Sequence, residues 1–192
     1  MRSRNTLLAL FSISLALIVF IVINPSSGKA LPNVIITKAQ TRLVDQTYRL
    51  DAVTALSLSH AALEALENGI ELTLIANITV SHPRTLWFSK VTKDASQKYH
   101  LRFHDLSQRY IVIDSQSGFK TQFRTHTSAL IHIGEIQNFP LIMVDDLEVD
   151  LNYFCQLSYS LDISELPAPL RLKAYFFNGW HFNSEAYQWR LQ

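Results

Sequence analysis

The feature that most constrains the fold is a long alternation of apolar and polar side chains between Ile70 and Ser81. One set of alternate positions is entirely apolar, and the intervening positions are mostly polar. The apolar set is Ile70, Leu72, Leu74, Ala76, Ile78 and Val80. Because successive side chains of a strand point to opposite faces, the pattern predicts a strand with one buried and one solvated face. Burial on one face only is typical of antiparallel sheets.

Similar patterns fill most of the chain after residue 33, without the strand–helix–strand rhythm of a parallel sheet. We expect further strands at residues 34–45, 48–58, 84–88, 99–104, 110–113, 119–123, 139–144, 151–161, 170–176 and 187–191. The polar stretch at residues 90–98 is interpreted as a loop or a strand rim. Prolines 167 and 169 predict an extended turn before the strand at 170–176.

Two short helices are expected in the connections. The first covers residues 59–68, with Ser59 as N-cap and Gly69 after its end, and the second covers residues 127–135, with Thr127 as N-cap. The fold class is therefore mainly β, an antiparallel β-sandwich with two short helices, preceded by an N-terminal hydrophobic helix.

That N-terminal helix is expected from the uncharged run between Leu7 and Ile23, in which only two serines are polar. Arg2 and Arg4 precede the run, and this charge bias holds an N-terminus in the cytoplasm. The run is long enough to cross the hydrocarbon core, so we favour an uncleaved signal anchor. The alternative is a signal peptide cut after Ala30. A buried helix of a soluble domain fits poorly, because the run is apolar on every face.

These observations divide the chain into residues 1–30, a signal anchor or signal peptide with its linker, and residues 31–192, one extracytoplasmic domain. The second part holds 14 basic and 16 acidic residues, which gives no basic footprint for nucleic acid. Cys155 is the single cysteine of the 192 residues, so an intrachain disulfide is excluded. The expected location is the inner membrane, with one N-terminal span and a periplasmic domain; the alternative is a soluble periplasmic protein.

The candidate metal ligands are histidines and a cluster of carboxylates. His100 and His104 share one strand face but are about 13 Å apart along it, too far to chelate one ion. The acidic run of Asp145, Asp146, Glu148 and Asp150 lacks the glycine turn of a calcium loop, and we interpret it as a solvated strand edge.

Two aromatic groups and the cysteine complete the candidates. Basic residues near aromatic ones could contact a polyanion or lipid headgroups, or lie in a solvated loop over the edge of the core: Arg84, Lys90, Lys93, Lys98 and Arg102 with Trp87, Phe88 and Tyr99. Trp180, His181, Tyr187 and Trp189 could line a groove, although an aromatic seal on one end of the sandwich is the favoured interpretation. Cys155 lies on the apolar face of its strand and is expected to be an inert thiol.

Three stretches resemble an exported bacterial family catalogued as domain of unknown function 4390: LSLSHAALEALENGIELTL from residue 56, KYHLRFHDLSQRYIV from residue 98, and LDISELPAPLRLKAYFFNGWHFNSEAYQW from residue 161. The resemblance covers most of residues 39–189. It implies a proteobacterial envelope protein with no assigned activity and no established catalytic residues. It also suggests a membrane sensor kinase as a class of partner.

No nucleophile elbow, phosphate loop or zinc-protease motif occurs in the sequence, so we expect no catalytic, cofactor-binding or metal-ligating residues. The expected function is a non-enzymatic binding or accessory module, attached to the inner membrane through residues 7–23 and contacting an envelope protein. The alternatives are an envelope hydrolase with a dispersed site, and a carrier for lipids or other hydrophobic ligands.

Overall fold

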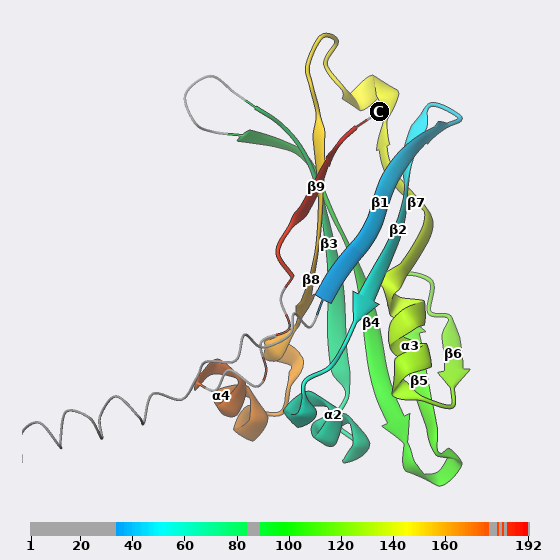
Figure 1. Ribbon diagram of the computed structural model, residues 1–192, viewed down its shortest axis with the longest axis vertical. Coiled ribbons are helices and arrows are strands. Elements are labelled where there is room, and N and C mark those ends of the chain that lie inside the picture. Colours follow the sequence, from blue (N-terminus) through cyan, green and yellow to red (C-terminus); the bar gives the residue numbers. More distant parts are fainter. Residues whose placement is uncertain (1–33, 84–88, 177–179, 181, 183, 192) are drawn as a thin grey trace, which may run out of the picture. The chain divides into compact units, whose positions relative to one another are not determined.

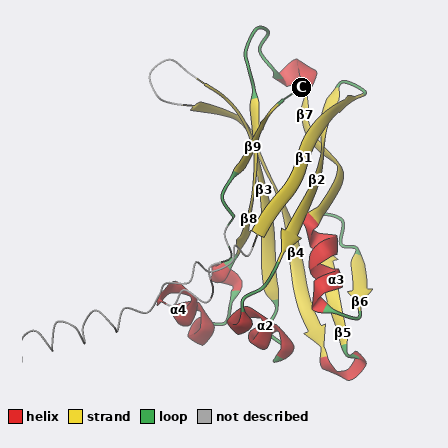
Figure 2. Cartoon of the chain, viewed as in Figure 1, coloured by secondary structure: helices red, strands yellow, loops and turns green. Residues whose placement is uncertain are grey.

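The computed structural model describes residues 34–83, 89–176, 180, 182 and 184–191, which lie within one compact unit, Pro32–Gln192. The expected N-terminal hydrophobic helix and the expected strand at 84–88 lie outside these residues. Within the described part of the chain, no helix is long and apolar enough to cross a membrane. Figure 2 shows that strands dominate the domain, so the mainly β prediction is confirmed.

The smaller of two antiparallel sheets contains β1 (Val34–Val44), β2 (Thr47–Leu56) and β7 (Glu135–Met143), in the order β1-β2-β7. Asp45 and Gln46 join the first two strands with φ angles of 45° and 61°. Two left-handed residues in sequence form the turn whose twist matches that of the flanking strands.

The larger sheet contains six antiparallel strands in the order β6-β5-β4-β3-β8-β9. Their bounds are β3 Leu72–Pro83, β4 Ser89–His104, β5 Arg109–Asp114, β6 Lys120–Phe123, β8 Phe154–Leu161 and β9 Tyr187–Arg190. Residues 90–98, interpreted from sequence as a loop or rim, form the first half of β4. Their side chains are mostly polar, but their backbone pairs with β3 from Ser89 onward, and this pairing defines a strand.

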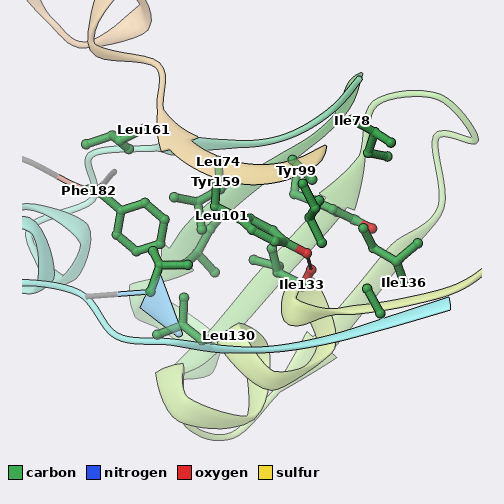
Figure 3. Close-up of a cluster of buried hydrophobic side chains, with 14 of the residues drawn as sticks. Leu74, Ile78, Tyr99, Leu101, Leu130, Ile133, Ile136, Tyr159, Leu161 and Phe182 are labelled. Carbon is green, nitrogen blue, oxygen red and sulfur yellow. Dashed lines mark hydrogen bonds between the residues drawn. The ribbon is translucent and has the colours of Figure 1, made fainter. Parts of the chain in front are cut away.

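The buried faces of both sheets contribute to one hydrophobic cluster. The apolar face predicted for β3 is fully buried, from Leu72 to Val80. Leu50 and Ala52 enter the cluster from the smaller sheet, and Tyr159 enters from β8. Figure 3 shows Leu74, Leu101, Ile133 and Tyr159 converging in the space between the two sheets.

The two expected helices are present as α2 (His60–Glu67) and α3 (His126–Gly134). Ser59 caps α2 as predicted, and its hydroxyl accepts a hydrogen bond from the Ala62 backbone. The cap predicted for α3 was wrong by two residues: Thr125, not Thr127, accepts from the Ser128 backbone. Both threonines precede the apolar periodicity, and only the extended backbone of Thr125 meets the requirement for a cap.

The strand expected at residues 170–176 is wrong, because this segment belongs to a third helix, α4 (Ala168–Phe176). Leu170 and Ala174 are four residues apart, so they satisfy helical as well as strand periodicity. Pro169 stands in the first helical turn, where a missing backbone N–H costs nothing. Figure 1 shows α2 and α4 at the end of the domain where β1 begins, and α3 beside β5 and β6.

Candidate functional site

A groove of about 430 Å³ lies where β7 of the smaller sheet faces β4 of the larger one. Its lining is mostly polar and comes from four elements: Gln97, Tyr99, Asp114, His132, Glu135, Ile136, Gln137, Asn138, Phe139 and Pro140. Ile136, Phe139 and Pro140 supply an apolar floor. Polar groups that converge on an apolar floor are the usual composition of a binding site.

Sequence reasoning missed this groove, because its residues are brought together only by the tertiary structure. One signal was present in β4, where Gln97 lies in phase with the buried Tyr99 and Leu101. Asp114 likewise continues the buried face of β5 beyond Val112. Polar side chains in the buried phase of two neighbouring strands indicate a place where the core opens to water.

The polar wall of the groove is fixed by hydrogen bonds. The Gln97 amide donates to Asp114 at 3.1 Å, and the other Asp114 oxygen accepts from the backbone of Gln116 and Ser117. Burial raises the pKa of Tyr99, and the negative charge of Asp114 adds to the effect. The Tyr99 phenol therefore stays protonated at neutral pH and is available as a hydrogen-bond donor, not as a base.

The opposite wall is β7, an edge strand of irregular geometry. One backbone edge of β7 has no strand partner within its sheet, in the part of the chain that the structure describes. Asn138 has a φ of 54°, and its backbone N–H donates to the Asp51 side chain at 2.9 Å. The pairing with β2 shifts register twice along its length. Irregular edges of this kind limit uncontrolled pairing while leaving backbone groups available for a selected partner.

A second polar cluster lies on the outer face of the larger sheet. His100 Nδ1 is 3.1 Å from Thr73 Oγ1, 3.1 Å from Glu71 Oε1 and 3.8 Å from Glu165 Oε2. The Thr73 hydroxyl also donates to Glu165. Hydroxyl, imidazole and carboxylate are the groups of a hydrolase triad, but Thr73 is only 2% exposed. A nucleophile must reach its substrate, so the cluster is better suited to a structural role.

That role is to fasten the short turn η3 (Ile163–Glu165) against the sheet. Lys98 Nζ lies 3.6 Å from Asp162 and 4.0 Å from Glu165. Hydrogen bonds from Ser164 lower the pKa of Asp162, and the charge of Lys98 adds to this effect. The Asp162 backbone N–H also donates to the Thr73 carbonyl at 2.8 Å. Since α4 follows η3 directly, these contacts position the start of that helix.

The histidines and carboxylates considered from sequence do not converge. His104 bonds to Ser107 in its own turn, away from the contacts of His100. The acidic run is not a strand edge: Asp145 and Asp146 belong to the turn η2 (Val144–Asp146), and Glu148 and Asp150 follow in the loop before β8. Among the described residues, no group of three metal-ligating side chains is positioned to hold an ion.

The residues of the two aromatic groups considered from sequence also lie on different elements. Lys90, Lys93, Lys98 and Arg102 lie on β4 and not in a loop, while residues 84–88 are outside the described part. Trp180 is buried beside α2 and α4, whereas Tyr187 and Trp189 lie on β9 with ring centroids 6.1 Å apart; His181 is not described.

The cysteine matches its prediction. Cys155 is fully buried in β8, and burial raises the pKa of its thiol to about 12, so it is unreactive at neutral pH.

The model of one protein family, "Domain of unknown function (DUF4390)", matches residues 32–190. No curated protein and no solved structure matches the chain. Since the match covers most of the sequence, the chain belongs to this family of unknown function.

Proposed function

We propose that this family member is a membrane-anchored periplasmic module that binds a protein partner and does not catalyse a reaction. The anchor is the uncharged run at residues 7–23, supported by Arg2 and Arg4 before it and by Pro25 and Gly28, which disfavour helix, after it. The observation that carries the binding role is the groove between β4 and the edge strand β7. The partner class to test first is a membrane sensor kinase.

The groove suits an extended peptide segment of that partner. The free edge of β7 offers backbone donors and acceptors to an added strand, and the polar side chains opposite it can select the sequence of that strand. The Tyr99 phenol lines the groove as a protonated group, and Asp114 is held in a fixed orientation by its own hydrogen bonds. Preorganised polar groups of this kind favour specific binding because little order must be created when the partner arrives.

The alternative functions receive less support. A hydrolase would need a reachable nucleophile. Among the described residues, the one hydroxyl in contact with both an imidazole and a carboxylate is that of Thr73, and it is buried. A carrier for hydrophobic ligands would need an empty apolar space between the sheets. We infer from their shared hydrophobic core that the two sheets form the two layers of a sandwich. Leu50, Ile78 and Leu157 are completely buried in that shared core. Their packing favours a solid interior.

Site-specific photo-crosslinking of the full chain in cells tests the proposal. A photoreactive residue at Gln137, exposed on the groove wall, should yield one crosslinked envelope protein. The matched control is Gln188, an exposed glutamine on β9, the edge strand of the other sheet. Wild-type chain without the photoreactive residue, added before irradiation, should compete for the partner and lower the crosslinking yield. The Gln137→Trp chain, whose indole fills the groove, should not lower it. Equal crosslinking from both positions, or an equal loss of crosslinking yield with both competitors, would contradict the proposal.

A further inference from the structure

Helix α4 carries an apolar face that the domain leaves uncovered. Leu172 is 63% exposed, Tyr175 is 62% exposed and Phe176 is 79% exposed. The opposite side of the helix packs on the domain through the buried Ala174 and the partly buried Leu170. A contiguous exposed apolar face of this kind marks a contact surface, unlike apolar residues that are exposed singly.

The charges of α4 lie at the borders of this face. With about 100° between successive residues, Leu172, Tyr175 and Phe176 form one arc, and Arg171 and Lys173 fall on its two sides. Arg171 also donates to the Leu166 carbonyl at 3.0 Å, so it is held at its border. The helix contains no acidic residue. An apolar arc between two cationic borders is the composition of a helix that lies in a lipid headgroup region.

The position of α4 in the fold agrees with such a surface. The helix shares a hollow of about 280 Å³ with α2, lined by Ala65, Leu170 and Trp180 among others. Helix α2 follows the end of β2, where Leu56 pairs with Val34, the first described residue. Figure 1 shows this end of the domain, with α2 and α4 near the start of β1. The chain therefore enters the described domain at the end that carries α4.

Chain length allows this end to reach a bilayer. Eleven peptide units separate Ile23 from Val34, and a fully extended chain of this length spans at most about 40 Å. If residues 7–23 cross the membrane, the α4 face is within reach of the same lipid surface. A short helix binds lipid weakly by itself, but a tether raises its effective concentration at the surface.

We propose that α4 rests on the anionic lipid surface of the membrane that holds residues 7–23, with Leu172, Tyr175 and Phe176 at the boundary between headgroups and acyl chains. This inference takes its tether from the proposed membrane anchor, but it does not depend on peptide binding in the groove. Lipid fits this face better than a protein, because the cationic borders match anionic headgroups and the aromatic side chains suit the interface.

The test places an environment-sensitive fluorophore on the full chain in lipid discs containing about one-third phosphatidylglycerol. The labelled variants are Phe176→Cys and, as a matched control, Phe119→Cys, a phenylalanine 77% exposed between β5 and β6. Cys155 stays unlabelled because it is buried and its pKa is about 12. A nitroxide on the acyl chains should quench the label at 176 and shift its emission to the blue, and both effects should be absent at 119.

Equal quenching at the two positions overturns the inference. A label at 176 that becomes buried only after a protein partner is added also overturns it. Lys173→Gln should weaken the contact about fivefold, the effect of removing one positive charge near an anionic surface, whereas Lys120→Gln on β6 should not. Loss of the chain from the discs would show that the anchor fails. Failure of the Gln137 crosslink with quenching at 176 intact would show that only the groove proposal fails.

Discussion

Helices α3 and α4 have nine residues each and both lie in connections between strands, yet the domain covers only one of them. Leu130 and Ile133 of α3 are buried, and its last residue, Gly134, touches the backbone of β2. In α4 only Ala174 is fully buried, and Leu172, Tyr175 and Phe176 face solvent. Helix α3 therefore contributes to the stability of the fold, whereas the apolar surface of α4 is available for contacts outside the domain.

The largest expected effect is at Gly134, where α3 meets β2. A Cβ atom at this position would lie 2.1 Å from the Thr54 carbonyl oxygen, so the backbones must separate. We expect Gly134→Ala to lower the free energy of unfolding by about 4 kcal/mol in denaturant titration of the full chain. Gly118→Ala is the control, because that Cβ meets nothing and only its φ of 71° costs about 1 kcal/mol. Equal losses of stability in the two variants would contradict the close approach of α3 to β2.

A smaller effect is expected from shortening a buried side chain of α3. Ile133 is completely buried, so Ile133→Ala should destabilise the domain by about 3 kcal/mol through lost burial and the remaining cavity. Ile131 stands in the same helix but is 56% exposed, and Ile131→Ala should change stability by less than about 0.5 kcal/mol. If the two variants unfold together, α3 does not pack as described.

The polar contacts before α4 predict a pH-dependent effect of about 1 kcal/mol. The pKa of Asp162 is lowered in the folded state by Ser164 and Lys98, so its charged form stabilises the fold above about pH 4, and this contribution disappears as pH falls through the lowered pKa. Asp162→Asn should be less stable than wild type at pH 7 and equal to it in acid. Asp145→Asn, in the exposed η2 turn, should match wild type at both; a pH-independent loss in Asp162→Asn would contradict this.

The smallest effect on stability is expected on the exposed face of α4. Leu172→Ser and Phe176→Ser should each change the free energy of unfolding by less than about 0.5 kcal/mol, since neither side chain is buried in the domain. Ala174→Leu, which forces a larger side chain into a filled space, should cost about 2 kcal/mol. A loss above 1 kcal/mol in both serine variants would mean that the fold itself uses this face.

The two helices also show what the sequence could and could not predict. Helix α3 was predictable because Leu130 and Ile133 fall at helical spacing and a threonine precedes them. Helix α4 was not, because Leu170, Leu172, Ala174 and Phe176 alternate as a strand does, and its prolines are typical of a turn. The exposure of three large apolar residues was the missing fact, and exposure depends on tertiary packing.

The groove and the polar cluster on the outer face of the larger sheet could not be predicted for the same reason. The alternation around Leu74 correctly predicted which face of β3 is buried, but not that Thr73 on the other face is also covered. Thr73 is covered by η3, which comes about ninety residues later in the sequence, after β8. The groove likewise needs β4, β5, α3 and β7 together. Local periodicity predicts faces, whereas sites formed by distant segments require the register of the whole sheet.

Amide hydrogen exchange of the full chain, measured in detergent and in discs with anionic lipid, tests the comparison most directly. Exchange reports local opening, so α3, packed on β2 and β5, should be protected equally in both conditions. Residues 168–176 should exchange faster than α3 in detergent and slow down when lipid is present. Unchanged exchange in α4 with lipid, or equal protection of the two helices in detergent, would contradict the account.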